Sequence, residues 1–208
     1  MASLPDNVTR LQALASPCRL CPRGCGALRA DGQVGSGGVG PEAVVASAGP
    51  HFGEEPVLVG SAGSGTIFFA GCNLHCVYCQ NHDISQSVRG EALSGRRLAR
   101  LALDLAARGC ANVNLVTPTP VAHLVAEAVH YARRKGLAVP VVYNCGGYES
   151  LETLRLLEGL VDVYMPDVKY ARSAAGAQYS AVQDYPAVAR AALAEMYRQV
   201  GPLEARDG

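Results

Sequence analysis

The sequence has 208 residues, of which 49% are hydrophobic, and its formal net charge is zero. This length allows one hydrophobic core with a small appendage. The neutral balance suggests no polyanionic partner such as nucleic acid, and no apolar run approaches the roughly 18 residues of a membrane span. Because the first residues lack the basic start and apolar stretch of a signal peptide, we expect a cytoplasmic protein without a membrane partner.

Eight cysteines are the most informative feature of the composition. In a reducing compartment, clustered cysteines bind metal or carry out chemistry more often than they form disulfides. Their thiolates are soft ligands that suit zinc, copper(I) and iron–sulfur clusters. Six of the eight form two groups, Cys18, Cys21 and Cys25, and Cys72, Cys76 and Cys79, whereas Cys110 and Cys145 stand alone.

The chain divides by composition into two segments. Its first part is rich in Gly, Pro and Cys and contains the run GQVGSGGVG at 32–40. We therefore predict an irregular Cys/Gly-rich lead-in over residues 1–62, without a core of its own. A core domain is predicted over residues 63–208, where short apolar runs alternate with helical patterns.

The core segment alternates strands and helices in chain order. Strands are expected at 66–70 (TIFFA), 113–117 (VNLVT), 139–144 (VPVVYN) and 161–165 (VDVYM). Helices with one apolar face are expected between them, beginning after Ser94, near Val121, after Ser150 and after Asp184, and ending near Gly109, Gly136 and Gly201. This spacing predicts right-handed βαβ units and a parallel sheet, an α/β fold.

The ends of these strands carry the side chains that could bind a ligand or take part in a reaction. In parallel α/β sheets, ligands bind at the carboxyl ends of the strands. Four constellations follow the strands, Cys72–Cys79, Thr117-Pro118-Thr119, Asn144-Cys145-Gly146-Gly147 and Asp167-Val168-Lys169. We therefore expect them to meet at one edge of the sheet.

The segment GCNLHCVYCQN spaces Cys72, Cys76 and Cys79 as CxxxCxxC in a loop directly after a strand. An ordinary 4Fe–4S cluster takes four thiolates, one for each iron, so three thiolates leave one iron open to an external molecule. The alternative is a zinc knuckle, which would need a fourth ligand such as His75 or His82.

This motif, with Tyr78 before its last cysteine, resembles the signature of the radical S-adenosylmethionine (SAM) superfamily. The resemblance covers nearly the whole chain, including the CRLCPRGCG of the lead-in. Longer stretches resemble a narrower family described as similar to pyruvate formate-lyase activating enzymes, namely GEEP, GSGTIFFAGCNLHCVYCQNHDIS, NLVTPTP, YNCGGYE and VDVYMPDVKY.

The resemblance implies a fold and a reaction. The fold is a partial (β/α) barrel with about four β/α units. The cofactors are a 4Fe–4S cluster and S-adenosylmethionine, whose reductive cleavage yields methionine and a 5′-deoxyadenosyl radical that abstracts hydrogen from a substrate. The implied partners are a glycyl radical enzyme or other protein substrate and an electron donor such as flavodoxin or ferredoxin.

The resemblance also assigns residues. Cys72, Cys76 and Cys79 match the cluster ligands, and Tyr78 matches an aromatic residue near the adenine. Where many members carry a Gly-Gly-Glu stretch, this chain has Thr117-Pro118-Thr119, so the threonine hydroxyls and strand-end carbonyls are expected to substitute. The alternative for this stretch is a proline-rich turn without ligand contact. No side chain is assigned a separate catalytic role.

Further cofactor-lining positions follow from the same family. They are Asn144, Cys145, Met165 and Asp167, and Asp167 is also a candidate for coordinating a cation. Lys169 is expected to face the cofactor's carboxylate or an acidic group of the substrate. An ordinary ion pair between Asp167 and Lys169 at the edge of the barrel is the alternative. Gly146-Gly147 permits close approach of a ligand, or is simply a turn.

The remaining candidates are left more open. Cys18, Cys21 and Cys25 match a family cluster whose fourth cysteine, expected near Gly35-Ser36-Gly37-Gly38, is missing; the alternatives are a metal site, a vestigial site and one completed by a partner. Cys110 is expected to be a small buried apolar residue. His51, His123 and His130 are expected to be structural, and contact with the substrate is an alternative for His51, which precedes the GEEP stretch.

The family's barrel normally continues for two more strands, whereas this sequence ends at GPLEARDG. We expect cluster binding to survive, because its ligands lie in one loop, and turnover to depend on the missing strands. Three other readings remain open, namely radical chemistry on a small molecule or another modification target, a non-catalytic iron–sulfur or zinc-binding module, and an inactive fragment of such an enzyme.

Overall fold

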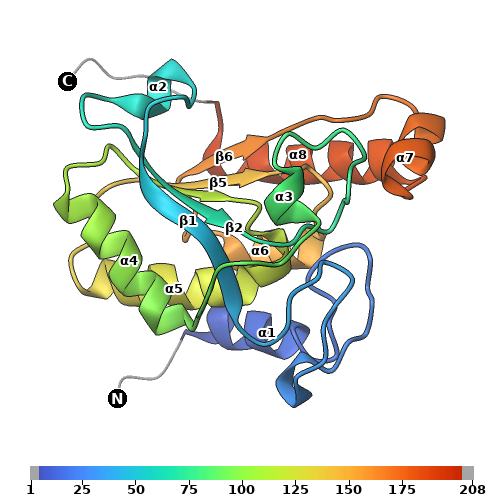
Figure 1. The fold of residues 1–208 in the computed structure, drawn as a ribbon, viewed down its shortest axis with the longest axis horizontal. Helices are drawn as coiled ribbons and strands as arrows, with labels where there is room; N and C mark the ends of the chain where they lie inside the picture. The colour runs from blue at the N-terminus through green and yellow to red at the C-terminus, as the bar shows by residue number, and fades with distance from the viewer. Residues whose placement is uncertain (1–4, 203–208) are drawn as a thin grey trace.

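The structure, a computed structural model, describes residues 5–202. Its centre is a six-stranded sheet in the order β3-β1-β2-β4-β5-β6, seen in Figure 1. The strands are β1 (Ala43–His51), β2 (Ser64–Phe69), β3 (Glu91–Leu93), β4 (Val113–Val116), β5 (Val141–Cys145) and β6 (Val163–Pro166). Strands β2, β4, β5 and β6 are mutually parallel, and β1 and β3 are antiparallel to their neighbours. This confirms the predicted α/β fold with a largely parallel sheet.

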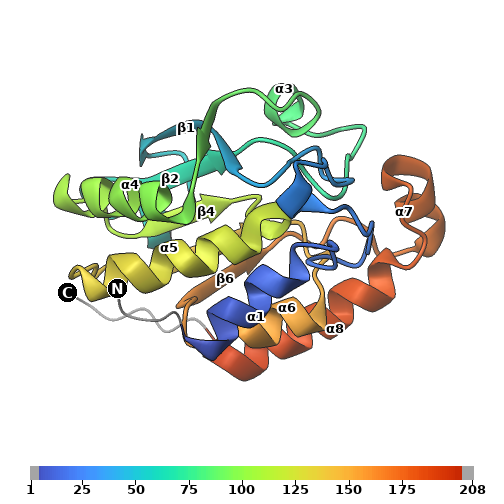
Figure 2. The ribbon, with the colours of Figure 1, turned by 90° about the horizontal axis from the view of Figure 1, so that it is seen from below.

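One face of the sheet is covered by helices α1 (Asp6–Leu14), α4 (Gly95–Ala107), α5 (Ala122–Arg134), α6 (Leu151–Leu157) and α8 (Tyr185–Val200) (Figure 2). The other described helices are α2 (Pro56–Val59), α3 (His82–Ser85) and α7 (Ser173–Ser180), and there are two short 3-10 turns, η1 (Arg29–Asp31) and η2 (Thr119–Val121). Helices α4, α5, α6 and α8 follow the apolar patterns predicted for them. Their predicted N-cap residues Ser94, Ser150 and Asp184 stand at the N-cap positions but make no side-chain cap hydrogen bond.

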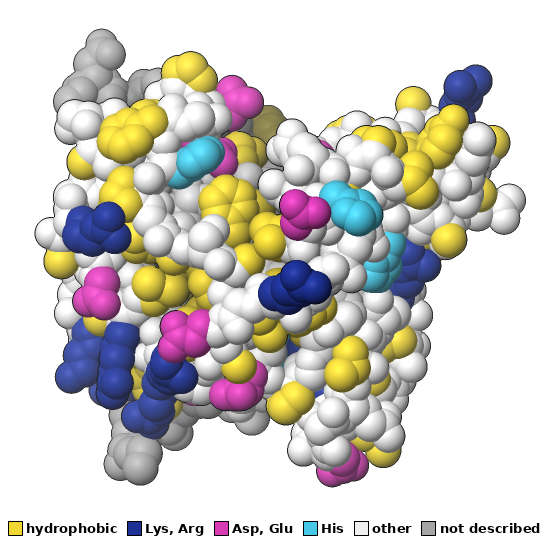
Figure 3. Space-filling view, viewed as in Figure 1, with side chains coloured by type: hydrophobic (Ala, Val, Ile, Leu, Met, Phe, Trp, Pro, Cys, Tyr) yellow, Lys and Arg dark blue, Asp and Glu magenta, His cyan; other side chains and the backbone are white. Residues whose placement is uncertain are grey.

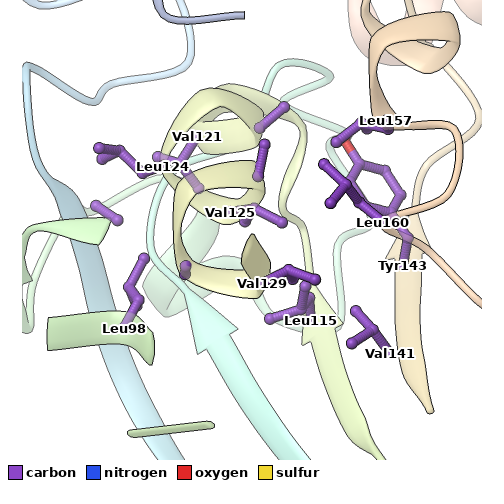
Figure 4. Packing of buried hydrophobic residues seen from close by; sticks show 14 of the residues in the cluster. Leu98, Leu115, Val121, Leu124, Val125, Val129, Val141, Tyr143, Leu157 and Leu160 are labelled. Carbon is purple, nitrogen blue, oxygen red and sulfur yellow. The ribbon is translucent and has the colours of Figure 1, made fainter. Parts of the chain in front are cut away.

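The face of the sheet beneath the helices is apolar. Successive side chains of a strand point to opposite faces, so alternate residues of β2, β4 and β5 pack under α4 and α5 (Figure 4). Leu98 of α4, Leu115 of β4 and Val125 of α5 meet there, and each is at least nine-tenths buried. This packing holds the carboxyl ends of the parallel strands at one edge of the molecule.

The opposite face of the parallel strands carries the site. The strand register aligns Phe68 of β2 with Val116 of β4, Val116 with Asn144 of β5, and Asn144 with Met165 of β6. These four side chains form one row across the sheet. Because the row lies at or next to the last residue of each strand, the loops that follow the strands surround it.

The lead-in differs from the irregular segment that its composition predicts. Helix α1 buries Val8, Leu11 and Leu14 against the same hydrophobic cluster as the rest of the chain, next to α5 and α6 (Figure 2). Strand β1 pairs with β2 along nearly its whole length. The pairing of β1 with the next strand is a tertiary contact, which Gly/Pro-rich composition does not reveal. Among residues 5–202, no helix has the length and apolar character needed to span a membrane.

Candidate functional site

A cavity of about 560 Å³ lies at the carboxyl ends of β2, β4, β5 and β6. It is lined by the row of strand residues described above and by the loops that follow the strands. In Figure 3 the surface is indented between the part that carries α2 and the projecting part that carries α7. The lining includes Cys72, Cys76, Tyr78, Cys79, Thr117, Asn144, Cys145, Met165, Asp167 and Lys169. The predicted meeting of the four constellations at one edge is therefore observed.

The loop with the three cysteines begins at a glycine that the packing requires. Gly71 follows β2 with φ +83°, a conformation that side chains with a Cβ rarely adopt. A Cβ at this position would lie 2.4 Å from the carbonyl oxygen of Gly37. The lead-in loop at 35–38 therefore packs directly against the start of the cysteine loop. Only a residue without a Cβ allows the two segments to pack this closely.

Each of the three sulfur atoms accepts a hydrogen bond. The Ser180 hydroxyl donates to Sγ of Cys76 at 3.0 Å, and the Ser85 hydroxyl donates to Sγ of Cys79 at 3.3 Å. The backbone N–H of Leu74 donates to Sγ of Cys72 at 3.4 Å. Burial raises the pKa of the Cys72 thiol, while the backbone hydrogen bonds oppose that rise. Such donors stabilise negative charge on thiolate ligands of iron.

The arrangement of the thiols distinguishes between kinds of metal centre. Among residues 5–202, no three His, Cys, Asp or Glu side chains gather closely enough to share one metal ion. A tetrahedral zinc site needs such a group, because all its ligands bind one ion. In a 4Fe–4S cluster each thiolate binds a different iron, so the sulfurs need not converge. The three cysteines around the cavity are compatible with the ligand set of a 4Fe–4S cluster.

The lead-in clamps the cysteine loop through one arginine. Nε of Arg23 donates to the carbonyl of Asn73 at 2.8 Å, and Nη2 donates to the carbonyl of Ser180 at 2.8 Å. Asn73 is itself buried, and its amide donates to the carbonyl of Tyr148. Arg23 thus links the lead-in, the cysteine loop and α7, three segments that the sequence separates widely.

Tyr78 stands at the mouth of the cavity with 54% of its surface exposed. Its ring makes edge-on contacts with the rings of Tyr170 and Tyr179, at centroid distances of 6.0 and 6.4 Å. These contacts fix one side of the ring and leave the rest accessible, as the predicted aromatic neighbour of an adenine requires.

The two threonines after β4 occupy different places. Thr117 lines the cavity and has φ +60°, a rare value for a β-branched residue. Strain of this kind tends to occur where function fixes the backbone. Thr119 is buried and does not line the cavity, and its hydroxyl donates instead to Oε1 of Glu149 at 2.6 Å. Of this predicted pair, only Thr117 faces the space that a cofactor would occupy.

Glu149 is a buried carboxyl behind the cavity wall, and no feature of the sequence predicted its role. Besides Thr119, it accepts a hydrogen bond from the Tyr143 hydroxyl at 3.4 Å. Burial raises the pKa of Glu149 to about 7, and the hydrogen bonds from Thr119, Cys145 and Tyr143 limit that rise. Burial and the charge of Glu149 also raise the pKa of Cys145 well above its usual range. Cys145 is therefore a neutral thiol in the cavity wall.

Asp167 and Lys169 form the ion pair that was one of the two alternatives for them, with 2.8 Å between Oδ2 and Nζ. Burial lowers the pKa of Lys169, but the hydrogen bond and charge of Asp167 outweigh burial and raise it. Both side chains also line the cavity, so the pair does not remove them from the site. Tyr185 supports this turn, because its hydroxyl accepts from the Lys169 N–H and contacts the Asp167 carbonyl.

The Gly146-Gly147 turn is explained by packing. A Cβ on Gly146 would lie 2.6 Å from Cδ1 of Leu74, in the cysteine loop. Gly147 has φ +73°, and its Cβ would lie 3.0 Å from the Asp167 carbonyl oxygen. The glycines thus let the loops after β2, β5 and β6 approach one another around the cavity.

The lead-in also contributes to the cavity, which its predicted role as an irregular segment did not include. His51 at the end of β1 lines the cavity together with Glu54 and Glu55 of the GEEP stretch. The His51 ring packs edge-on against Phe68 at a centroid distance of 5.8 Å. His123, in contrast, is buried in α5, where burial and the charge of Arg29 lower its pKa to about 3. Cys110 is buried in the main hydrophobic cluster, as predicted.

The other three clustered cysteines lie in the lead-in, outside the cavity lining. Cys18 and Cys21 are buried, whereas Cys25 is exposed. The backbone N–H of Ser36 donates to Sγ of Cys25 at 3.5 Å. Ser36 therefore stands beside this group, in the stretch where the family was expected to supply a fourth cysteine.

Comparisons with known proteins agree with this site. Residues 66–185 match the family model of the Radical SAM superfamily. A relative, the uncharacterized protein MJ0674 of Methanocaldococcus jannaschii, is 36% identical over 143 residues, which cover 65% of this chain and 40% of that protein. The chain thus spans less than half the length of this curated relative. No solved structure matches the chain significantly. The family match extends over more than half of the chain and includes the cysteine loop and all four parallel strands, and this chain belongs to the radical SAM superfamily.

Proposed function

We propose that this protein binds a 4Fe–4S cluster through Cys72, Cys76 and Cys79 and uses it to cleave S-adenosylmethionine reductively. Proteins of the radical SAM superfamily generally use these two cofactors. The observation that carries the proposal is that all three thiols lie in the wall of one 560 Å³ cavity at the ends of four parallel strands. A cavity of this volume lies within the range of about 300–1,000 Å³ that is usual for small-molecule and cofactor sites.

When bound, the cluster and S-adenosylmethionine supply the electron transfer that breaks a carbon–sulfur bond and yields a 5′-deoxyadenosyl radical. The chain's own part is to bind and orient these groups. Ser180 and Ser85 place hydroxyl donors on two of the sulfurs. Phe68 and Met165 provide apolar walls that limit access of water to the cavity. Three cysteine ligands leave one iron for the cofactor to bind.

The strand-end residues are proposed to hold S-adenosylmethionine. Tyr78 is proposed to contact the adenine, and the Lys169 ammonium is proposed to contact a carboxylate. Thr117, Asn144, Cys145, Met165 and Asp167 complete the lining. Thr119 is proposed to act indirectly, because its hydroxyl is bonded to Glu149 behind the wall.

We further propose that the substrate is a protein, as the resemblance to pyruvate formate-lyase activating enzymes implies. Large apolar side chains are exposed in the segments that border the cavity. They are Phe52, Val57, Val77, Tyr78, Val168 and Tyr179. Exposed apolar residues at such positions are available for contact with another protein. We propose a glycyl radical enzyme as the substrate and flavodoxin or ferredoxin as the electron donor.

The central test is electron paramagnetic resonance of the protein after anaerobic reconstitution with iron and sulfide. The reduced protein is expected to give a 4Fe–4S signal that changes when S-adenosylmethionine is added, because the cofactor binds directly to the open iron. Formation of 5′-deoxyadenosine, measured by chromatography, reports cleavage. Uptake of zinc alone, or a signal that the cofactor does not change, would contradict the proposal.

Two variants make the test specific. Cys76→Ala is expected to prevent formation of the 4Fe–4S signal. Cys110→Ala removes an equally buried thiol that lies in the hydrophobic core away from the cavity, and it is expected to retain the signal. Equal loss in both variants would show that the effect is one of folding.

A separate measurement tests whether the substrate is a glycyl radical enzyme. The reconstituted protein is incubated with a candidate glycyl radical enzyme, a reductant and S-adenosylmethionine. A glycyl radical signal on the partner supports activation of that enzyme. Cleavage of S-adenosylmethionine that never yields a protein radical would favour a small-molecule substrate instead.

A further inference from the structure

The lead-in folds back on itself so that two of its cysteines become neighbours. The N–H of Cys18 donates to the Ala27 carbonyl at 2.9 Å, and the N–H of Gly26 donates to the Cys18 carbonyl at 3.0 Å. This pairing brings Cys25, which precedes Gly26, alongside Cys18. The Cys18 side chain lies close enough to the Cys25 sulfur to lower the pKa of that thiol. Of the two thiols, Cys18 is buried and Cys25 is exposed.

The surroundings of Cys25 favour its thiolate form. Partial burial alone would raise the pKa of Cys25, but hydrogen bonds from the backbones of Ala27 and Ser36 and from the side chains of Ser36 and Cys18 lower it below its ordinary value. The third thiol differs, because burial raises the pKa of Cys21 to about 12. The thiolate is the nucleophilic form of cysteine. Exposure and environment thus single out Cys25 as the reactive member of the group.

The three lead-in thiols do not converge on the position of a single metal ion. Within the described residues 5–202, these three thiols do not form a set that could hold one metal ion. The nearest contact from the 35–38 stretch to Cys25 is made by Ser36, whose N–H donates to the sulfur. A backbone N–H is a donor and cannot act as a metal ligand.

We propose that Cys25 and Cys18 form an oxidisable pair that reacts with hydroperoxides. The Cys25 thiolate attacks the peroxide oxygen, the O–O bond breaks, and Cys25 becomes a sulfenic acid as water or an alcohol leaves. The Cys18 sulfur then attacks the Cys25 sulfur and displaces water, which forms a disulfide. The two thiols together lose two electrons and two protons, and the peroxide gains them. A dithiol reductant restores the pair by exchange.

The pair is linked to the loop that carries the proposed cluster ligands. Arg23, two residues before Cys25, donates to the carbonyls of Asn73 and Leu74. Ser36, whose N–H contacts Cys25, also places its carbonyl oxygen 2.6 Å from Nε2 of His75. A disulfide between Cys25 and Cys18 competes with the hydrogen bond that the Cys25 sulfur accepts from the Ser36 N–H, and it therefore acts on the Ser36 link. The Ser36 link joins the oxidisable pair to the cysteine loop.

Peptide mapping after oxidation tests the pair directly, because trypsin places each lead-in cysteine on its own peptide. The reconstituted protein is treated with hydrogen peroxide, quenched in acid, alkylated and digested. Cys18 lies in 11–19, Cys21 in 20–23 and Cys25 in 24–29, and the cysteine loop lies in 30–89. The expected product is 11–19 joined to 24–29 by a disulfide. This readout does not depend on the cluster or on cleavage of S-adenosylmethionine.

Variants and a reactivity measurement test which two thiols form the disulfide and which of them reacts first. Cys18→Ala is expected to leave Cys25 as a sulfenic acid that dimedone traps, whereas Cys21→Ala should form the disulfide as before. Iodoacetamide at neutral pH should modify Cys25 on the order of tenfold faster than Cys21. Linkage of 20–23 instead of 11–19, absence of any disulfide, or binding of one zinc ion that protects all three thiols would each overturn the proposal.

Discussion

The hydroxyl of Thr119 donates a 2.6 Å hydrogen bond to the buried carboxyl of Glu149, thirty residues further along the chain. Thr119 follows β4, and Glu149 follows β5, so the bond ties the ends of two neighbouring parallel strands. Tyr143, within β5, contacts the other carboxyl oxygen. The Glu149 side chain therefore holds together the ends of β4 and β5 behind the wall of the cavity.

Glu149 is expected to make stability depend on pH. Burial raises its pKa in the folded protein to about 7 from a usual value of 4.5. Between these values the folded protein retains a proton that the unfolded chain has released, so stability falls as pH rises and then levels off above about pH 7. At 1.36 kcal/mol per pKa unit, the total loss is about 3 kcal/mol.

Glu149→Gln keeps the shape of the side chain and removes this titration. We expect the free energy of unfolding of the original protein, relative to Glu149→Gln, to fall by about 3 kcal/mol between pH 5 and pH 8. Urea unfolding at both pH values measures the difference. Parallel pH profiles for the two proteins would show that the carboxyl does not titrate in this range.

Ser180→Ala tests the hydrogen bond to the proposed ligand Cys76. The hydroxyl lies 3.0 Å from the sulfur and stabilises added negative charge there. Without it, the reduced cluster loses about 1 kcal/mol of stabilisation, so the reduction potential should become more negative by roughly 40 mV. A potentiometric titration followed by electron paramagnetic resonance measures this shift.

Ser173→Ala serves as the control for Ser180, because it changes an exposed serine at the start of the same helix. Its potential should match that of the original protein. Ser85→Ala, which removes the longer 3.3 Å contact to Cys79, should give a smaller shift in the same direction. Unchanged potentials in both Ser85→Ala and Ser180→Ala would argue against Cys76 and Cys79 as ligands.

Arg23→Met tests the clamp between the lead-in and the cysteine loop. It removes the donors to the carbonyls of Asn73 and Ser180, so the loop should open more often. We expect a loss of about 1–3 kcal/mol in the free energy of unfolding and faster hydrogen exchange at 73–79. Arg19→Met, at an exposed position of the same loop, should leave the exchange of these amides unchanged.

Leu11→Ala tests whether the lead-in shares the core of the rest of the chain. Leu11 is fully buried in α1, and truncation of such a residue costs about 2–5 kcal/mol. Because α1 packs on α5 and α6, the loss should appear in the unfolding of the whole protein as a single transition. Leu28→Ala, at a 40% exposed position, should change stability by less than about 0.5 kcal/mol. Separate melting of α1 would show an independent segment.

The parallel part of the sheet could be predicted because its strands are short, continuously apolar and separated by amphipathic helices. All four predicted strands are present, with ends within two residues of the expected positions. Strand β1 could not be predicted in this way. Its sequence AVVASAGPH contains small residues and a proline, and its stability comes from pairing with β2. Local pattern does not record a partner that lies elsewhere in the chain.

Some residues of the candidate site could likewise be predicted from local sequence, and others could not. The CxxxCxxC spacing identified Cys72, Cys76 and Cys79, because neighbouring thiols in one loop are a local feature. Ser180 and Arg23 were not identified, because their contacts with this loop join residues about 50 to 104 positions apart. Thr119 was expected in the cavity, and the twist of the chain at η2 turns its hydroxyl to Glu149 instead.

The sequence by itself determined the positions of the parallel strands along the chain, the loop that carries the three thiols and the edge of the sheet where the strand-end residues meet. These follow from periodicity and spacing, which are properties of neighbouring residues. Only the tertiary structure decided which donors contact each sulfur, which carboxyl is buried behind the wall and which lead-in thiols are paired. Those features depend on contacts between distant segments, and packing selects them only after the sheet has formed.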